Sequence, residues 1–563
     1  MTKRPSSGFD SARLIGTVCE VSANIARANL PNASRSSPVW HLGNRVGGGE
    51  VGEFVVVESG EYAIFGRINN VRIPERERLT VEPRLGTEKE PNPVGEIQLL
   101  ATGNFLNGHV VAGVQRHPRL GERVFSAHPD IVAWFTRGTP DDDVVSMRMA
   151  RTSGSEVDID VVPEKLFGRH CAVVGSTGGG KSWTVAGLIE QACTHRAKVI
   201  LLDATGEFRT LSCGVTHVHI GRTATPDPDS EEVSAPYSQL TENDIFALFK
   251  PSGQSQAPKL RAAIKTLKLL RCEPSLGSGG VLKKANSLRA PFGDAYRKHS
   301  AFVESSVADF DITKLARQIE LECVFTNDRK DPLRYGDPSE NERSYCIGLI
   351  NRVDEVVNAP EMACVMNPGT SKSITDVIGQ FIEGSKRLLR ISLEHVSFAH
   401  NAREIVSNAI GRRLLAISRE GAFQQSPVVV FVDEAHQFFG KTLGDEFSRF
   451  ELDAFELIAK EGRKYSLTVV LSTQRPRDIA EGVLSQMGTF VVHRLINDKD
   501  RAVIERASNE LDESASAMIP SLSPGEAVVI GVDFPIPLVL RMRTPAQPPD
   551  SRGPDYQTYW RNI

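Results

Sequence analysis

Short apolar runs fill the first 150 positions of the chain. They are rich in β-branched residues, are separated by Gly, Pro, Asn and Ser, and read LIGTVCEV, EFVVVES, YAIFGRINNVRI, EIQLLATGNF and VVAGVQ. Runs of this length and composition predict β-strands, and closely spaced short strands favour a small barrel or sandwich. We therefore expect residues 1–150 to form a small β-barrel, with an exposed excursion rich in Glu, Arg and Pro at residues 75–95.

From residue 170 the pattern changes to buried strands that alternate with helices. The apolar run CAVVG is followed by a glycine-rich loop, the helical segment SWTVAGLIEQAC and a second apolar strand, KVILLD. Strand, helix and strand in this order predict a βαβ unit in a parallel sheet. Further elements are expected as strands at 388–393, 428–433, 467–473 and 489–495 and as a helix at 402–420.

The stretch between residues 237 and 385 interrupts this alternation. The segments QAPKLRAAIKTLKLLR and SVADFDITKLARQIELE carry apolar residues at helical spacing. We interpret 237–385 as a helical insertion and assign the α/β core to 151–236 and 386–543. Residues 544–563 are Pro-rich and polar and end in aromatic residues, so we expect a tail that docks on a neighbour.

Composition sets limits on the class of protein. A chain of 563 residues exceeds one core. The net charge of −4 is not that of a basic nucleic-acid binder, although a ring can concentrate positive charge in its lumen. The eight cysteines form no C-x-x-C pair, which argues against zinc sites and favours reduced thiols. Because neither a signal-like segment nor a long apolar run occurs, we expect a cytoplasmic protein without a membrane span.

Residues 175–182 match the phosphate-loop pattern G-x-x-x-x-G-K-[ST] between a strand and a helix. The loop consists of Gly175, Ser176, Thr177, Gly178, Gly179, Gly180, Lys181 and Ser182, followed by Trp183. Glycines allow successive N–H groups to point at phosphate oxygens, and the helix adds its positive dipole end. Lys181 can neutralise phosphate charge and Ser182 can ligate Mg²⁺. An accidental match occurs in roughly a few per cent of chains of this length, so we expect all nine residues to bind ATP.

Hydrolysis requires further groups that position the metal and the attacking water. The segment VVVFVDEAHQFF supplies two acids: Asp433 ends an apolar strand and is expected next to Mg²⁺, and Glu434 is expected to activate water. The alternative is an acidic pair that caps the next helix. His436 could assist Glu434 or be structural.

The order of the motifs resembles that of the HerA-type ATPases. After the phosphate loop come DATGEF at 203–208, VDEAHQF, EGRKYS at 461–466 and LSTQRP at 471–476, and the N-terminal strands are similar to the barrel that precedes the motor in HerA. The resemblance implies an α/β fold with a RecA-like P-loop NTPase core, an N-terminal β-barrel and a helical insertion. It also implies a homo-hexameric ring that uses ATP and Mg²⁺, with double-stranded DNA in the central pore.

The same resemblance implies roles for single residues. Gln474 corresponds to the sensor of the γ-phosphate, and the other residues expected near the nucleotide are Arg169, Asp203, Glu207, Ile536 and Pro537. Position 205 is threonine where the family usually has histidine, so no role is carried over to it. Arg463 resembles the arginine finger that reaches a neighbouring subunit. Cations near a helix C-terminus also compensate its dipole, and Lys464, Arg449 or Arg475 could be the finger instead.

The DNA-contacting residues and the biological role stay open at this stage. Basic residues on the insertion form a candidate DNA-binding face, or an ordinary solvated helix surface: Lys259, Arg261, Lys265, Lys268, Arg271, Lys283 and Lys284. We favour a DNA translocase or helicase subunit that works with a separate effector, a nuclease or a sirtuin-like NAD hydrolase, in antiviral defence. The alternatives are a DNA end-processing translocase of the HerA–NurA type and a conjugation-type or secretion-type pumping ATPase.

Overall fold

The computed structural model divides into two compact units, which are described separately below. The first comprises Met1–His195, Ser472–Arg477 and Leu484–Pro548, and the second comprises Arg196–Leu471, Asp478–Val483 and Pro549–Ile563. The structure describes residues 9–34, 39–41, 44–74, 92–137, 144–152, 158–223, 227–306, 309–367, 369–439, 441–445, 448–508, 513–532, 534–550 and 556–560. Most of the expected excursion at 75–95 lies outside these ranges. The boundaries predicted at 150, 236, 385 and 543 stay predictions.

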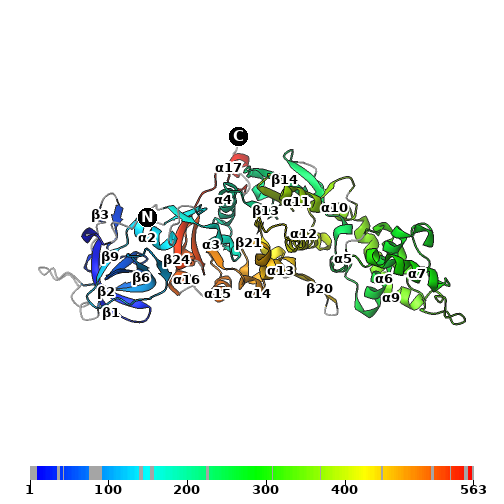
Figure 1. Cartoon of the computed structure of the whole chain (residues 1–563), viewed down its shortest axis with the longest axis horizontal. Helices are drawn as coiled ribbons and strands as arrows, with labels where there is room; N and C mark the ends of the chain where they lie inside the picture. Colours follow the sequence, from blue (N-terminus) through cyan, green and yellow to red (C-terminus); the bar gives the residue numbers. More distant parts are fainter. Residues whose placement is uncertain are drawn as a thin grey trace. The chain divides into compact units, whose positions relative to one another are not determined.

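Six antiparallel strands of the first unit close into a barrel (Figure 1). Around the ring they are β1 (Leu14–Val21), β9 (Arg123–Ser126), β5 (Phe54–Ser59), β6 (Tyr62–Arg72), β7 (Val94–Asn104) and β2 (Ile25–Asn29), which pairs again with β1. The strand β8 (Val110–Ala112) adds to β7. Gly16 permits the close approach of β1 and β2, because a Cβ there would lie 2.0 Å from the carbonyl oxygen of Asn29. The predicted barrel is therefore confirmed.

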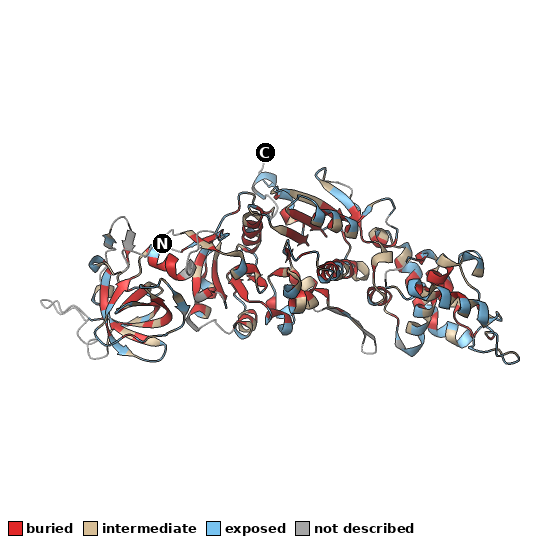
Figure 2. Cartoon of the chain, viewed as in Figure 1, coloured by how far each residue is buried: buried red, intermediate tan, exposed pale blue. Residues whose placement is uncertain are grey.

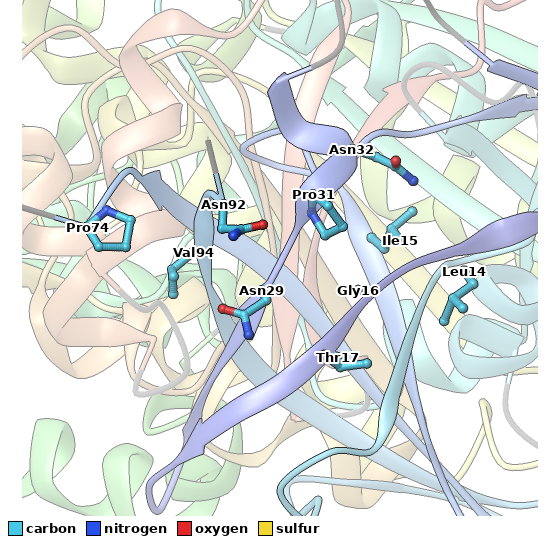
Figure 3. A pocket seen from close by; sticks show the side chains of 10 residues that line it. All are labelled: Leu14, Ile15, Gly16, Thr17, Asn29, Pro31, Asn32, Pro74, Asn92 and Val94. Carbon is cyan, nitrogen blue, oxygen red and sulfur yellow. The ribbon is translucent and has the colours of Figure 1, made fainter. Parts of the chain in front are cut away.

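The inward side chains of the barrel strands form its apolar core, and Figure 2 shows buried positions along these strands. The helix α2 (Pro129–Arg137) extends this packing, because the ring of Phe135 stacks on Phe65 at 4.6 Å. A pocket of about 560 Å³ opens on the barrel wall (Figure 3). Its lining is uncharged and includes the amide side chains of Asn29, Asn32 and Asn92.

The first unit also contains an edge of sheet that leads to the phosphate loop. Its strands, in spatial order, are β11 (Asp158–Val161), β10 (Met147–Thr152), β24 (Phe534–Met542), β23 (Glu526–Gly531), β22 (Thr489–Val492) and β12 (Cys171–Val174). Only β22 and β12 run parallel to each other in this set. The helix α4 (Lys181–Cys193) follows β12, and α3 (Pro163–Phe167) precedes it.

The sheet of the second unit is parallel throughout. Its spatial order is β21 (Leu467–Thr473), β18 (Val428–Val432), β13 (Lys198–Asp203), β17 (Leu388–Ser392), β14 (Val215–Ile220), β15 (Ser230–Ser234) and β16 (Lys372–Ser373). The last two residues of β21 belong to the first unit. The helices α12 (Ala402–Arg419) and α13 (Ala454–Glu461) accompany this sheet, and the hairpin of β19 (Lys441–Asp445) and β20 (Ser448–Leu452) lies between β18 and α13 in sequence. The predicted α/β core is thus confirmed.

The predicted insertion is helical as expected, and Figure 1 shows α6, α7 and α9 grouped together. Its helices are α5 (Glu242–Phe249), α6 (Gly253–Cys272), α7 (Arg289–Val303), α8 (Leu315–Leu321), α9 (Glu340–Asn358), α10 (Ala363–Met366) and α11 (Ile374–Glu383). The predicted helical segment at 306–322 is shorter than expected, because Asp311 accepts a hydrogen bond from the Thr313 N–H and starts a separate 3-10 turn there. Within the described ranges, no helix combines the length and apolar character that a membrane crossing requires.

Most of the basic side chains that form the candidate DNA-binding face of the insertion are engaged in ion pairs with nearby carboxylates. Lys259 pairs with Glu342 at 2.7 Å and Lys284 with Glu322 at 2.6 Å. The same holds for Arg261 with Glu242, Lys265 with Glu304 and Arg271 with Asp309, while Lys268 donates to the carbonyl oxygen of Ser305. Local carboxylates thus neutralise these charges, which favours an ordinary helix surface over a DNA-binding face.

Candidate nucleotide site

The phosphate loop joins β12 to α4, as the sequence predicts. Gly178 and Gly180 have φ angles of +76° and +105°, in the left-handed region that favours glycine. Gly180 is the N-terminal cap of α4, and Lys181 is its first residue and is buried. The backbone therefore turns sharply just before a helix N-terminus, which is the arrangement that presents N–H groups to an anion.

Three neighbouring chain segments hold this loop in place. The N–H of Gly175 donates to the carbonyl oxygen of Thr473 at 3.3 Å, where β21 ends. The N–H and hydroxyl of Ser176 both donate to the carbonyl oxygen of Arg494, at 2.9 and 2.8 Å. Finally, the N–H of Gly525 donates to the carbonyl oxygen of Gly179 at 3.1 Å. The protein itself therefore fixes the shape of the loop.

His493, which follows β22, lies directly beneath the loop and is fully buried. Its Nδ1 lies 2.9 Å from the carbonyl oxygen of Glu526, and its Nε2 lies 2.9 Å from the hydroxyl of Thr184 on α4. A carbonyl oxygen only accepts, so Nδ1 carries the proton and Nε2 accepts from Thr184. Burial, with a smaller contribution from the charge of Lys181, lowers the pKa of His493 to about 4. The imidazole is therefore neutral at physiological pH.

Sequence reasoning missed His493 as a site residue. A histidine that ends a buried apolar strand is a weak signal, because its partner Thr184 is 309 positions away in the sequence. The close fit explains why position 175 is glycine: a Cβ there would lie 2.5 Å from the Cβ of His493.

Gln474 lies beside the phosphate loop. The hydroxyl of Thr177 donates to its side-chain oxygen at 2.7 Å. The structure thus brings together two residues that lie 297 positions apart in the sequence. Gln474 therefore lies next to the phosphate loop, and its role as a sensor of the terminal phosphate stays a prediction.

Three other residues expected at the nucleotide lie away from the loop of their own chain. Arg169 precedes the strand β12, whereas the phosphate loop follows this strand. The four residues of β12 span about 13 Å, which separates the backbone of Arg169 from the loop. Gly525 and Glu526 form the end of the β23–β24 hairpin next to the loop, while Ile536 and Pro537 lie toward its other end, where Phe534 pairs with Gly531.

Contact of these three residues with the base or ribose of the nucleotide stays a prediction. Pro537 is buried within β24, and the side chain of Ile536 lies outside the described residues. The C-terminal segment approaches the loop through Gly525 instead. Trp183, in the first turn of α4, is 40% exposed.

In the second unit, Asp433 and Glu434 follow β18. Asp433 is buried, and its N–H donates to the carbonyl oxygen of Leu202 at 3.0 Å. Glu434 has a φ of +46°, a strained value for a residue with a side chain. It occupies the N-cap position of the turn Ala435–Gln437, but its side chain makes no capping hydrogen bond. The capping alternative is therefore not supported. Nδ1 of His436 lies 3.2 Å from the Glu434 carboxylate, which favours a helper role for this histidine.

Asp203 organises the turn DATGEF. Its fully buried carboxylate pairs with Arg390 at 2.7 Å and accepts hydrogen bonds from the N–H groups of Gly206 at 2.8 Å and Phe208 at 3.1 Å. These contacts fix the turn after β13, and the expected role of Asp203 at the nucleotide stays a prediction. Glu207, partly exposed at the start of the following 3-10 turn, is the better candidate from this motif.

Arg463 lies in the 3-10 turn Gly462–Tyr465 that follows α13, and it is exposed. Among the described residues it has no ion-pair partner, so its guanidinium is available to another chain. Of the three alternative finger residues, Lys464 is also exposed. The backbone N–H of Arg475 donates to the hydroxyl of Thr473. The side chain of Arg449 lies outside the described residues. The exposure of Arg463 is compatible with the finger role that the resemblance implies, and Lys464, Arg449 and Arg475 stay alternatives.

A strand, a glycine loop with the GKS ending and a helix that begins at the lysine define a P-loop nucleotide-binding protein. Two family models match the chain: the central domain of the helicase HerA at residues 148–282, and the HerA-like helicase C-terminal domain at residues 415–553. The chain therefore contains regions similar to both the central and the C-terminal domain of HerA-type helicases, and it resembles the HerA-like P-loop ATPases.

Relatives with curated names agree with this assignment. The DNA double-strand break repair helicase HerA of Pyrococcus furiosus is 24% identical over 438 residues, which cover 75% of this chain and 73% of the relative. A HerA helicase of Methanocaldococcus jannaschii is 26% identical over 396 residues, or 67% of this chain and 72% of the relative. Among solved structures, VirB4 of Thermoanaerobacter pseudethanolicus aligns with a TM-score of 0.42 and 12% identity, covering 74% of this chain and 99% of VirB4.

Lowering the pH should destabilise the folded protein through His493. Its pKa is about 4 when folded, against an ordinary value of 6.5, so the unfolded chain binds a proton that the folded one rejects. Stability is then fully present above pH 6.5 and falls toward pH 4, by about 1.4 kcal/mol per pH unit and about 3 kcal/mol in total.

Urea unfolding across this pH range measures the effect. His493→Gln should flatten the pH dependence, while His109→Gln, at an exposed position, should leave it as in the wild type. Equal pH dependence in all three proteins would show that His493 is not held neutral.

Proposed function

We propose that this protein is the subunit of a ring-shaped ATPase that moves double-stranded DNA. The observation that carries the proposal is the preformed phosphate loop, with Gln474 hydrogen-bonded to Thr177, in a chain that resembles the HerA-like ATPases. The relative from Pyrococcus furiosus is named as a DNA double-strand break repair helicase. A ring that grips backbone phosphates moves DNA without reading its sequence.

The residues of the first unit fit a nucleotide triphosphate. The left-handed glycines Gly178 and Gly180 leave the N–H face of the loop free of side chains. Lys181 supplies a positive charge at the first position of α4, and the Ser182 hydroxyl follows it. We assign phosphate binding to residues 175–183 and magnesium ligation to Ser182.

The acids of the second unit fit the remaining roles in hydrolysis. Asp433 is the proposed carboxylate ligand of Mg²⁺, which when bound neutralises charge on the phosphates. Glu434, with His436 against its carboxylate, orients and deprotonates the attacking water. Glu207 and Gln474 are proposed to respond to the state of the terminal phosphate.

We also propose a homo-hexamer in which Arg463 acts on the nucleotide of the neighbouring subunit. The exposure of Arg463 and the absence of an ion-pair partner in the described part of the chain support this role. An arginine supplied in this way stabilises the charge that develops during phosphoryl transfer. Arg169, which lies away from its own loop, is proposed to act across the same interface.

A separate effector protein completes the proposal. The C-terminal tail presents the aromatic side chains of Tyr559 and Trp560, which are 82% and 76% exposed, and such rings are enriched where proteins bind each other. We propose a cytoplasmic complex with a nuclease or an NAD hydrolase in antiviral defence. Two alternative functions share the same motor chemistry. An end-processing translocase would differ from the proposed complex only in its partner protein. A conjugation-type or secretion-type ATPase would instead work at a membrane channel.

The function is tested first by ATP turnover with and without duplex DNA. Wild-type protein should hydrolyse ATP faster when DNA is added. Glu434→Gln should lower the rate about 10²–10⁴-fold, because the water loses its base, while nucleotide binding persists. Glu420→Gln removes an exposed carboxylate of the same type and should hydrolyse ATP like the wild type. Hydrolysis by Glu434→Gln at the wild-type rate would contradict the assigned role.

The arginine finger is tested by mixing two inactive proteins. Arg463→Ala retains an intact phosphate loop and Lys181→Ala retains an intact finger, so mixed rings contain some complete sites at subunit interfaces. ATP turnover of the mixture should exceed the sum of the two separate rates. Lys464→Ala, one position along the same turn, should be active alone; a Lys464→Ala protein that is inactive alone and is rescued by Lys181→Ala would make Lys464 the finger instead. A mixture as inactive as its components would argue against a role in trans.

A further inference from the structure

Four arginines line a hollow on the sheet edge of the first unit. The hollow has a volume of about 370 Å³ and is lined by Arg148, Ala150, Arg151, Asp158, Arg541, Met542, Arg543 and Thr544. It is distinct from the phosphate loop, since none of its lining residues belongs to residues 175–183. Arg148 and Arg151 belong to β10, Arg541 belongs to the neighbouring strand β24, and Arg543 directly follows the end of β24.

The strand register places two of these guanidinium groups on the same face. Arg151 on β10 is paired directly with Arg541 on β24. Along β24 burial alternates, so Leu540 and Met542 are buried while Arg541 and Arg543 are exposed. Like charges directly opposite each other on paired strands are destabilising, which makes a bound anion the natural complement of this face.

The neighbouring carboxylates compensate only half of the arginines. Arg148 pairs with Asp158 at 3.1 Å and with Asp160 at 3.4 Å, and Arg151 pairs with Asp158 at 2.9 Å. Arg541 and Arg543 form no ion pair with any described residue, although Glu526 on β23 is the cross-strand neighbour of Arg541. The guanidinium groups of Arg541 on β24 and of Arg543, which directly follows this strand, therefore have no ion-pair partner among the described residues.

We propose that Arg541 and Arg543 bind a backbone phosphate of the DNA that this ATPase moves. The inference rests on the proposed function and specifies a contact for it. A guanidinium presents two parallel N–H donors that match phosphate oxygens, and an open hollow rimmed by such groups suits a phosphodiester that passes over it. A contact of this kind does not depend on base sequence.

The position of these arginines links the DNA contact to the nucleotide. Met542 lies between them, and its N–H donates to the carbonyl oxygen of Gly525 at 2.9 Å. The N–H of Gly525 in turn donates to the carbonyl oxygen of Gly179 in the phosphate loop. Two consecutive hydrogen bonds therefore connect the arginine-bearing strand to the loop, and a pull on β24 by DNA is transmitted to it.

Binding of labelled duplex DNA to the full-length chain tests the proposal, with fluorescence anisotropy recorded over a series of salt concentrations and two unrelated DNA sequences. Arg541→Gln/Arg543→Gln should weaken binding about tenfold or more at low salt. Its plot of log affinity against log salt should be shallower by about 2, because each lost phosphate contact removes about 0.9 from the slope. Both DNA sequences should respond alike.

Two further proteins serve as controls. Arg297→Gln/Arg317→Gln removes the same charge from exposed positions of the insertion, where Asp294 and Glu320 pair with these arginines, and should bind DNA like the wild type. Arg541→Lys/Arg543→Lys keeps the charge and should recover most of the salt slope.

The possible results distinguish a failure of the arginine–DNA contact from a failure of the proposed function. A double glutamine variant that binds DNA with wild-type affinity and slope overturns this inference alone. Loss of ADP affinity without loss of DNA affinity would assign the arginines to the phosphates of the nucleotide and also overturn it. Absence of DNA binding by the wild type would overturn the proposed function and this inference together.

Discussion

The backbone N–H groups of the phosphate loop can face an anion only because carbonyl groups from elsewhere in the chain hold the loop. Thr473 and Arg494 accept hydrogen bonds from its first residues, and Gly525 donates one to Gly179. His493 fills the space below as a neutral imidazole. A protonated ring would place a second positive charge close to Lys181 and would reverse the direction of the hydrogen bond with Thr184. Burial therefore protects both the shape and the electrostatics of the loop.

Acidic residues follow the ends of two parallel strands of the second unit, and they differ in the groups that they contact. Asp203 is saturated by Arg390 and by the N–H groups of its own turn, so it shapes the chain after β13. Glu434, after the adjacent strand β18, adopts a strained backbone conformation and contacts His436. Strain of this kind persists where the surrounding structure enforces it and is concentrated at functional sites. Two acids that look alike in the sequence thus differ in role because of what surrounds them.

Local sequence patterns predicted the parts of the fold that local patterns determine. Continuous apolar runs such as β13 and β18 and the phosphate loop were found where expected. The strand β14 was missed because VTHVHI mixes polar and apolar residues, and β2 because it is short and contains Arg27. Contacts between distant positions, such as His493 with Thr184 or Lys284 with Glu322, leave no periodic signal. Resemblance alone placed Arg169, Ile536 and Pro537 at the nucleotide; strand direction places them away from the phosphate loop, and their contact with the nucleotide stays a prediction.

Calorimetric titration of the folded chain with an adenine nucleotide and Mg²⁺ tests the central claim most directly. If the loop is preformed as described, each chain binds nucleotide, and Lys181→Ala loses this binding while its unfolding temperature stays close to that of the wild type. A well-folded wild-type protein that takes up no adenine nucleotide would contradict the account at its foundation.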